Sequence, residues 1–381
     1  MTFSARNLRY LAAATFMLVS GSLLASPIPS APSVDANSYV LMDFHSGGLL
    51  ADMEPDKSVE PASITKVMTG YVVFSALESG SISLDDQVIV SERAWRMPGS
   101  RMFVEVGREV TVEDLLQGMI IQSGNDASVA LAEHVAGSEA AFVDMMNQYT
   151  QQLGMENTSY ANSTGLPDEN QYTTAYDTAL LARALIKDFP DYYDWYSERE
   201  FTYNGIRQNN RNTLLWRDDS VDGIKTGHTR SAGYCLVTSA QRDDARLVSV
   251  VMGSSSERSR ADASQTLLNY GFRFFETHRL YAAGESLAEE RVWGGAADSV
   301  PLGLEEALYV TVPRGRYNDL EPIMNISGRL DAPIREGDEL GTVRVSLDGE
   351  TVAERPVFAK NDVASGSLWR RLVDRVKLFF E

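Results

Sequence analysis

The sequence reads Pro61-Ala62-Ser63-Ile64-Thr65-Lys66 and then stays apolar over residues 67–77. A proline and small residues ahead of a long apolar run are typical of a helix start. Because the run is apolar almost all round, it predicts a buried helix that ends near Gly80. Ser63 and Lys66 are three residues apart, so on this helix they share one face and their side chains can touch.

This pairing of residue types has a chemical meaning. A serine hydroxyl is a weak nucleophile until a base takes its proton, and a neutral amine can be that base. Burial and a second cation nearby both favour the neutral form of a lysine. Unpaired N–H groups in the first turn of a helix stabilise negative charge. Taken alone, however, Ser63 and Lys66 also fit a surface helix with an N-cap serine and an inert lysine.

Two further motifs give this pair its context. Downstream lie Ser123-Gly124-Asn125 and Lys225-Thr226-Gly227, the latter followed by His228. Each is unremarkable alone, since Ser, Gly and Asn are ordinary turn formers. Ser-x-x-Lys, Ser-x-Asn and Lys-Thr-Gly in this order, separated by domain-scale gaps, form the signature of penicillin-interacting serine acyltransferases.

The surrounding pattern predicts where these motifs lie. Ser123-Gly124-Asn125 is expected to be a tight link between helices over residues 115–122 and 126–135. Lys225-Thr226-Gly227 is expected on a strand beside an antiparallel hairpin over residues 233–253. Such a strand edge could pair with an extended peptide. By contrast, Pro98-Gly99-Ser100-Arg101 fits a plain surface turn better than a cleft border.

Composition limits the possible functions. Of 381 residues, 44% are hydrophobic and 23% are charged, as in soluble globular proteins. This length allows one large domain or two ordinary ones. The formal charge of −19 argues against nucleic acid as a partner, because nucleic-acid binding needs a basic surface.

The N-terminus predicts export. Arg6 and Arg9 precede an apolar core over residues 11–24, and the small residues Ala25 and Ser26 follow, as in a secretory signal peptide over residues 1–26. A membrane-spanning anchor is the alternative, but the apolar segment is short for one. Cys235 is the only cysteine and lies in an apolar run, so it is expected to be a buried thiol without a disulfide partner.

The remaining chain divides into three parts. Residues 27–279 carry all three motifs and are expected to close with a helix over residues 261–276. Residues 280–363 are rich in turns and short apolar runs, which predicts a small all-β domain. Residues 364–381 predict an amphipathic helix that lies on an anionic membrane surface, with a helix docked on its own β domain as the alternative. The apolar positions of this tail are Leu368, Trp369, Leu372, Val373, Val376, Phe379 and Phe380.

These features together resemble the penicillin-binding protein 5 and 6 type of D-alanyl-D-alanine carboxypeptidase, a low-molecular-mass class C group that forms peptidase family S11. The resemblance implies an α+β fold: a serine β-lactamase and penicillin-binding transpeptidase-like domain, with an antiparallel sheet and helices, followed by the all-β domain and the amphipathic helix. Further stretches that match are Gln122-Ser123-Gly124-Asn125-Asp126-Ala127, Gly205-Ile206-Arg207-Gln208, Val221-Asp222-Gly223-Ile224 and Gly271-Phe272-Arg273-Phe274-Phe275-Glu276.

The resemblance also implies a reaction. Ser63 would attack the carbonyl between the two terminal D-alanines of a peptidoglycan pentapeptide, Lys66 would accept its proton, and Ser123 would relay a proton to the leaving amine. This removal of D-alanine limits cross-linking in the cell wall, and β-lactams would inhibit it by acylating the same serine. No metal and no cofactor are expected. The residues implied in substrate binding are Asn125, Lys225, Thr226, Gly227, His228, Arg211 and Arg260.

Within that set the implied roles differ. Backbone N–H groups of Ser63 and His228 would form the oxyanion hole. Thr226, with Arg211 and Arg260, would bind the terminal carboxylate of the substrate. The implied location is the periplasmic face of the bacterial inner membrane, with the tail as a peripheral anchor.

Two other functions compete with this one. A serine β-lactamase uses similar motifs, but a class A enzyme has an aspartate in the middle motif and a dedicated glutamate that activates water, whereas this chain has Gly124. A non-catalytic penicillin-recognising scaffold is disfavoured by the intact pair of Ser63 and Lys66.

Overall fold

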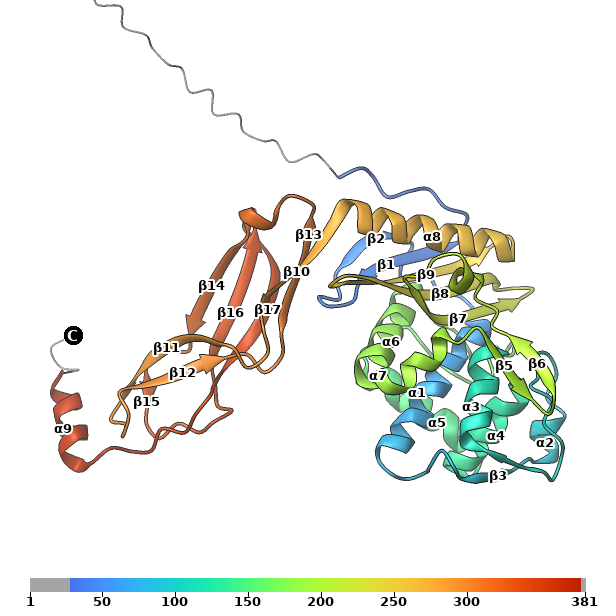
Figure 1. The fold of residues 1–381 in the computed structure, drawn as a ribbon, viewed down its shortest axis with the longest axis horizontal. Coiled ribbons are helices and arrows are strands. Elements are labelled where there is room, and N and C mark those ends of the chain that lie inside the picture. Colours follow the sequence, from blue (N-terminus) through green and yellow to red (C-terminus); the bar gives the residue numbers. More distant parts are fainter. Residues whose placement is uncertain (1–27, 378–381) are drawn as a thin grey trace, which may run out of the picture.

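The computed structural model describes residues 28–377, in two domains joined in sequence (Figure 1). The expected signal peptide and the tail residues Phe379 and Phe380 lie outside the described residues. The first domain combines a sheet with helices, and the second is built from strands, as the sequence predicts.

A five-stranded antiparallel sheet forms one side of the first domain. Consecutive residues of its strands face opposite ways: Leu41 packs with the residues of α8 (Glu257–Phe274), whereas Met42 packs with those of α1 (Thr65–Glu78). The sheet is therefore buried on both faces, with β7 at its edge. Its strands, in spatial order, are β2 (Leu49–Met53), β1 (Ser38–Asp43), β9 (Ala245–Ser254), β8 (Gly233–Arg242) and β7 (Val221–Thr229).

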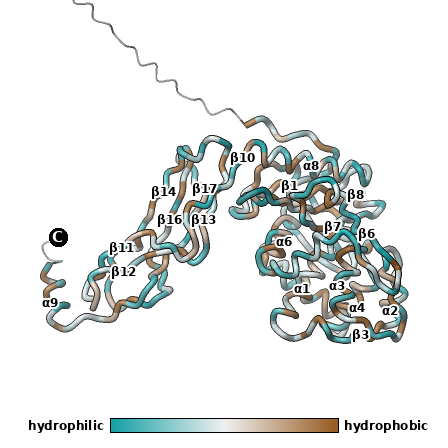
Figure 2. Tube along the Cα trace, viewed as in Figure 1, coloured by the Kyte–Doolittle hydropathy of each residue, from teal (hydrophilic) through white to brown (hydrophobic). Residues whose placement is uncertain are grey.

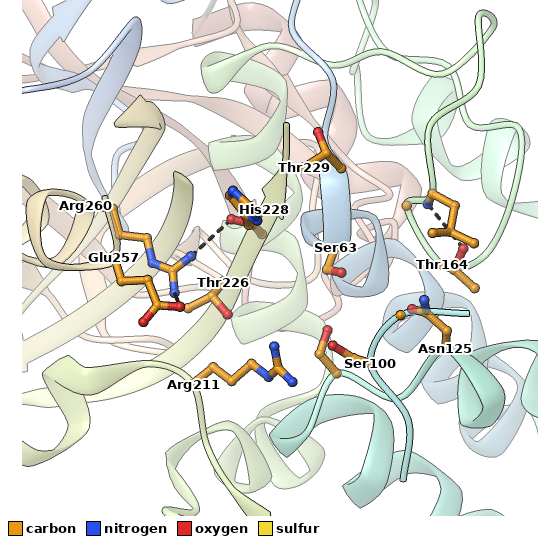
Figure 3. A pocket seen from close by; sticks show the side chains of 15 residues that line it. Ser63, Ser100, Asn125, Thr164, Arg211, Thr226, His228, Thr229, Glu257 and Arg260 are labelled. Atoms are coloured by element: carbon orange, nitrogen blue, oxygen red, sulfur yellow. Dashed lines mark hydrogen bonds and ion pairs between the residues drawn. The ribbon is translucent and has the colours of Figure 1, made fainter. Parts of the chain in front are cut away.

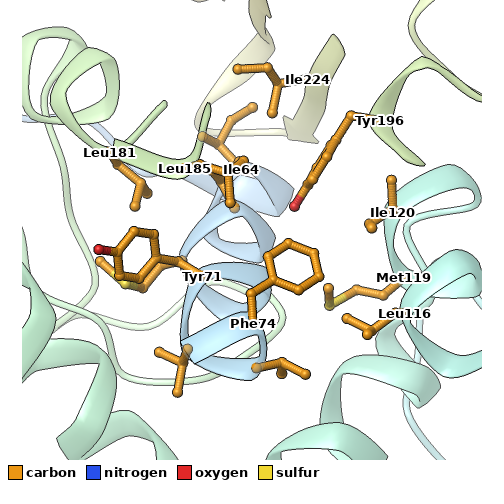
Figure 4. Packing of buried hydrophobic residues seen from close by; sticks show 14 of the residues in the cluster. Ile64, Tyr71, Phe74, Leu116, Met119, Ile120, Leu181, Leu185, Tyr196 and Ile224 are labelled. Carbon is orange, nitrogen blue, oxygen red and sulfur yellow. The ribbon is translucent and has the colours of Figure 1, made fainter. Parts of the chain in front are cut away.

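Helix α1 is the centre of the other half, and its burial confirms the prediction from the apolar run. It continues the short 3₁₀ helix η1 (Ala62–Ile64), and most of its side chains are buried. Figure 4 shows Tyr71 and Phe74 packed among residues of the neighbouring helices. Phe74 is fully buried, so truncating it to alanine should cost about 3–5 kcal/mol. The surrounding helices are α3 (Val112–Ile121), α4 (Asn125–Ala136), α5 (Glu139–Gln152) and α6 (Ala175–Asp188).

Several small elements complete this domain. The hairpin of β5 and β6 lies close to α3 (Figure 1). One short helix, α2, begins at the N-cap Ser91 and was not expected from the sequence. The small elements are β3 (Gln87–Ile89), α2 (Glu92–Trp95), β4 (Glu109–Thr111), α7 (Pro190–Tyr193), η2 (Asp194–Ser197), β5 (Glu200–Tyr203), β6 (Ile206–Asn209) and η3 (Thr213–Trp216).

The expected helix over residues 261–276 is wrong at both ends, and α8 begins at Glu257, four residues earlier than expected. Helix α8 stops at Phe274, and β10 (Phe275–Tyr281) begins at once, paired with β13 (Leu308–Pro313). The guanidinium of Arg314 donates to the carbonyls of Phe272 and Phe275. Helix ends leave carbonyls without partners, so a residue distant in sequence helps to end this helix.

The second domain is a six-stranded sheet with its own apolar core, which includes Val300, Val310 and Val345. This confirms the predicted all-β fold. Its order is β14-β16-β17-β12-β11-β15, and the pair of β10 and β13 lies beside it. The strands are β11 (Ser286–Trp293), β12 (Ser299–Gly303), β14 (Glu321–Ile326), β15 (Leu330–Asp331), β16 (Glu339–Leu347) and β17 (Glu350–Ala359); η4 (Tyr317–Asp319) precedes β14.

Helix α9 (Leu368–Lys377) ends the described chain, and hydrophobic and hydrophilic residues alternate along it (Figure 2). Leu368 is 83% exposed and Trp369 is 74% exposed, so this end of its apolar surface does not pack on the β domain. The helix meets that domain through polar groups instead: Arg370 pairs with Asp298, and Asp374 accepts a hydrogen bond from the N–H of Gly294 at 3.0 Å. Among residues 28–377, no helix combines the length and apolarity that crossing a bilayer requires.

Candidate active site

A cleft of about 400 Å³ lies beside the edge strand β7 and brings the three motifs together (Figure 3). Eight of the ten residues expected from the sequence line it, and Lys66 and Lys225 are buried behind it. The lining residues are Ser63, Gly99, Ser100, Ser123, Asn125, Thr164, Gly165, Leu166, Arg211, Thr226, Gly227, His228, Thr229, Glu257 and Arg260.

Ser63 lies in η1, immediately before α1, and its side chain is in the cleft. The preceding residue, Ala62, has φ +47°, which is uncommon for a residue with a side chain. Strand β7 passes close by: a Cβ on Gly227 would lie 3.1 Å from Cγ1 of Ile64 and 3.2 Å from the carbonyl oxygen of Pro61. Glycine at position 227 therefore lets β7 approach the segment that carries Ser63.

The Lys66 amine has a defined set of partners. Its Nζ lies 2.6 Å from Oδ1 of Asn125, 2.5 Å from the carbonyl oxygen of Thr164 and 3.3 Å from Oγ of Ser63. A neutral amine has two N–H donors and one lone pair. With both donors held by Asn125 and Thr164, the lone pair is left for the hydroxyl proton of Ser63.

The surroundings of Lys66 favour that neutral form. Its side chain is 1% exposed, and burial, together with the charge of Arg211, lowers its pKa from the usual 10.5 to about 7. The charge of Asp126 acts in the opposite direction. A base whose pKa lies near 7 is available at neutral pH.

The middle motif links α3 and α4, as expected. Ser123 is buried with φ +65°, and its Oγ has no hydrogen-bond partner among the described residues. Asn125 is the first residue of α4, and its Nδ2 donates to the carbonyl of Pro98 at 2.6 Å while its Oδ1 binds Lys66. The amide of Asn125 is thus fixed in one orientation, and Ser123 has an uncommitted hydroxyl.

The third motif lies on β7, also as expected. Lys225 is buried, and burial together with the charges of Lys66, Arg211 and Arg260 lowers its pKa well below the usual value. Arg260 of α8 donates to the carbonyl of Gly227 at 3.1 Å.

The outer part of the cleft is cationic. Arg211 follows β6 on an exposed loop, and Figure 3 shows it on the same side of the cleft as Thr226 and Arg260. The ring of His228 stacks on Tyr234 with centroids 4.0 Å apart. A small molecule with a carboxylate would find two guanidinium groups and a hydroxyl there.

Two segments of the cleft were missed or misassigned from the sequence. Gly99 and Ser100 line the cleft, so the preference for a plain surface turn at 98–101 is wrong. The reason is that Asn125 binds this segment twice, through its side chain to Pro98 and through its N–H to the carbonyl of Ser100. Thr164 was not singled out at all, because it contributes a backbone carbonyl, which no residue type signals.

Cys235 is buried, as expected, and burial raises the pKa of its thiol. This disfavours a nucleophilic role for it. Among residues 28–377, no group of three or more His, Cys, Asp or Glu side chains is placed to hold a metal ion.

Comparison with known proteins places the chain among a well-defined set of relatives. The family described as D-alanyl-D-alanine carboxypeptidase matches residues 26–256, and the C-terminal domain of penicillin-binding protein 5 matches residues 275–365. The D-alanyl-D-alanine carboxypeptidase DacA of Escherichia coli (strain K12) is 42% identical, over 99% of this chain and 98% of its own length. DacC of the same organism is 43% identical, over 100% of this chain and 98% of its own length.

Solved structures agree with these matches. Penicillin-binding protein 5 from Haemophilus influenzae superposes with a TM-score of 0.82 at 42% identity and covers 88% of this chain and 100% of its own. Penicillin-binding protein D2 from Listeria monocytogenes in its ampicillin-bound form superposes with a TM-score of 0.60 at 28% identity, over 64% of this chain and 100% of its own.

Proposed function

The chain belongs to the D-alanyl-D-alanine carboxypeptidase family, and from this we propose that Ser63 is the nucleophile that removes the terminal D-alanine from a peptidoglycan stem peptide. The observation that carries the proposal is the position of Lys66. Its buried amine is 3.3 Å from Oγ of Ser63, and its other two close partners are hydrogen-bond acceptors.

Acylation would proceed in two proton transfers. Lys66 takes the proton of Ser63 as its oxygen attacks the carbonyl between the two terminal D-alanines. The proton then has to reach the leaving amine, and Ser123, whose hydroxyl is not committed to another described group, would relay it. The products are free D-alanine and a peptide esterified to Ser63, which water hydrolyses in the second half of the reaction.

Fixed donors would stabilise the negative charge that develops on the attacked carbonyl. We assign this role to the backbone N–H groups of Ser63 and His228, because β7 packs directly against the segment before Ser63. Donors of this kind typically contribute about 3–4 kcal/mol each to the transition state. Asn125 would bind the peptide group of the substrate, with Lys225 as a further substrate-binding residue, and the charge of Arg211, which lowers the pKa of Lys66, would help to keep Lys66 neutral.

The terminal carboxylate of the substrate would bind at the cationic end of the cleft. Thr226, Arg211 and Arg260 lie there. A β-lactam carries a comparable carboxylate and a strained amide, and it would acylate Ser63 and remain attached.

The alternatives fit less well. A class A β-lactamase activates its deacylating water with a glutamate, and the one acid that lines the described cleft, Glu257, lies 3.9 Å from Arg260 at the cationic end. A non-catalytic scaffold would have no use for a buried amine held against a serine.

Release of D-alanine from diacetyl-lysyl-D-Ala-D-Ala distinguishes the three functions. The carboxypeptidase turns this peptide over and is blocked by penicillin, a β-lactamase prefers penicillin as substrate, and a scaffold hydrolyses neither. Mass spectrometry of the penicillin-treated protein should place the drug on Ser63. Attachment at another residue, or none, overturns the proposed nucleophile.

We also propose the division of the chain into a signal peptide (1–26), a peptidase domain (27–279), a β domain (280–363) and a tail (364–381). Strand β10, which begins at Phe275 and pairs with β13, forms the junction between the second and third parts. In this proposal the protein is exported and works at the periplasmic face of the inner membrane. The exposed Leu368 and Trp369 of α9 support contact of the tail with that membrane surface.

A further inference from the structure

A single buried carboxylate holds one wall of the cleft. Asp126, the second residue of α4, is 1% exposed. Its Oδ1 accepts hydrogen bonds from the N–H groups of Met102 and Ala127, both at 3.0 Å. Its Oδ2 accepts from the N–H of Phe103 at 2.9 Å and of Val104 at 3.3 Å. Three successive amides of one loop therefore converge on one side chain.

This loop is part of the site. The carbonyls of Pro98 and Ser100 bind the side chain and the N–H of Asn125, and Ser100 lines the cleft. Phe103 has φ +71°, a conformation that costs about 1–2 kcal/mol for a residue with a side chain. The hydrogen bonds to Asp126 offset that cost, because the three amides of 102–104 can all reach one carboxylate only in this backbone conformation.

The same carboxylate also acts on Lys66 through its charge. The charge of Arg211, on the loop after β6, lowers the pKa of Lys66. Lys225 and His228 on β7 and Arg260 on α8 are further basic groups of the site. Asp126 is the acid whose charge opposes them and raises the pKa of Lys66, against burial and Arg211. In a buried site such an interaction is screened little by solvent.

We propose that Asp126 is a positioning residue that fastens the 98–104 loop to Asn125, the hydrogen-bond partner of Lys66, and places a buried negative charge next to that partner. Asp126 has no place in the reaction itself, because it is committed to four backbone amides. The inference rests on the proposed role of Lys66.

The test is the Asp126→Asn variant, assayed for the rate of Ser63 acylation by labelled penicillin between pH 5 and pH 9. The amide keeps the size of the side chain, but it lacks the charge and presents a donor where Oδ2 now accepts. Without the charge the pKa of Lys66 falls, so the acid limb of the rate profile moves to lower pH. The ratio of the variant rate to the wild-type rate should therefore be more than about twofold higher at pH 5 than at pH 9. A shift of one unit in the pKa of Lys66 would change this ratio about tenfold.

A matched control is Glu133→Gln, which removes one negative charge from the same helix. Glu133 lies seven residues further along α4, roughly 10 Å along its axis, and its variant should keep the wild-type profile. An Asp126→Asn profile that is lowered equally at all pH values overturns the electrostatic part of the inference. If the wild-type protein itself has no acid limb near neutral pH, the proposed base is wrong, which is a separate failure.

If Asp126→Asn does not fold, hydrogen exchange of the unmodified protein tests the attachment of the 98–104 loop to Asp126 independently. The amides of Met102, Phe103 and Val104 should exchange their hydrogens with solvent as slowly as those of the central strands. Exchange at the rate of exposed loop amides would show that Asp126 does not hold this loop.

Discussion

Lys66 Nζ lies 2.6 Å from Oδ1 of Asn125, although 59 residues separate them. The contact joins the first motif to the second, because Lys66 belongs to α1 and Asn125 begins α4. It also orients the lysine: one N–H is directed to Asn125 and another to Thr164, so the lone pair of the neutral amine faces Ser63.

The first prediction concerns the base. Lys66→Ala should lower the rate of acylation by labelled penicillin by about 10²–10⁴-fold, the usual contribution of a general base, while circular dichroism shows a folded protein. Lys66→Arg should be equally impaired, because a guanidinium does not lose its proton in proteins. Labelling of either variant at the normal rate would exclude Lys66 as the base.

The second prediction is the pH dependence of the wild-type enzyme. Acylation needs Lys66 without its proton, and the pKa of Lys66 is lowered to about 7. The rate constant for acylation should therefore rise with pH, with a midpoint near 7, and fall about tenfold per pH unit well below it. Stopped-flow measurement of acylation provides the profile. A rate that is flat from pH 5 to pH 9 contradicts the assignment.

The third prediction compares two glycines with positive φ. Gly165 has φ +83°, and a Cβ there would lie 1.8 Å from the carbonyl oxygen of Ala62, next to Ser63. Gly154 has φ +71° with open space around its missing Cβ. Gly154→Ala should cost about 1–2 kcal/mol of stability through strain alone and leave the rate of D-alanine release unchanged. Gly165→Ala should displace the segment before Ser63 and reduce that rate at least tenfold. Equal rates for the two variants would disprove the clash.

The fourth prediction concerns support for the Thr164 carbonyl. The buried carboxylate of Glu139 accepts from the N–H of Ser163 at 3.0 Å and from its hydroxyl at 2.8 Å, and it pairs with the largely exposed Arg93. Glu139→Ala leaves those donors unpaired, which costs about 1–3 kcal/mol of stability. It should also slow acylation, because the segment that carries the Thr164 carbonyl, a hydrogen-bond acceptor of Lys66, is held less firmly. Arg93→Ala keeps both bonds to Ser163 and should change the rate much less. Thermal unfolding and acylation kinetics on both variants decide the matter, and identical kinetics would remove Glu139 from this role.

The fifth prediction concerns the tail. Removing residues 367–381 should release the protein from vesicles that contain anionic phosphatidylglycerol, since the exposed Leu368 and Trp369 are lost. Hydrolysis of the soluble peptide should stay unchanged, because the cleft lies in the other domain. The double variant Leu368→Ser, Trp369→Ser should weaken vesicle binding in the same direction. Binding that persists after the truncation argues against an anchor.

Much of the site was accessible from the sequence because its chemistry depends on side chains at fixed spacing. Ser63 and Lys66 one turn apart, the link at Ser123-Gly124-Asn125 and the strand with Lys225-Thr226-Gly227 all lie as predicted. The buried helix α1 followed from its apolar run, and the β domain from its short apolar runs and turns.

What could not be predicted depends on backbone groups brought together by tertiary structure. Any residue type can supply a backbone carbonyl or amide. The sequence therefore predicted neither the hydrogen bond from Lys66 to the Thr164 carbonyl nor the bonds from the amides of 102–104 to Asp126. Helix α8 ends two residues earlier than predicted because Arg314, forty residues later in sequence than Phe274, binds the carbonyls of Phe272 and Phe275 on either side of this end, and because Phe275 pairs with Pro313.

The polar contacts of α9 with the β domain bear on how far the enzyme can reach. Arg370 and Asp374 tie this helix to Asp298 and Gly294, at the end of the β domain remote from the peptidase domain (Figure 1). These two contacts orient the helix relative to the β domain. If the helix lies on the bilayer, as proposed, the β domain stands between the lipid and the peptidase domain and would set the distance of the cleft from the membrane surface.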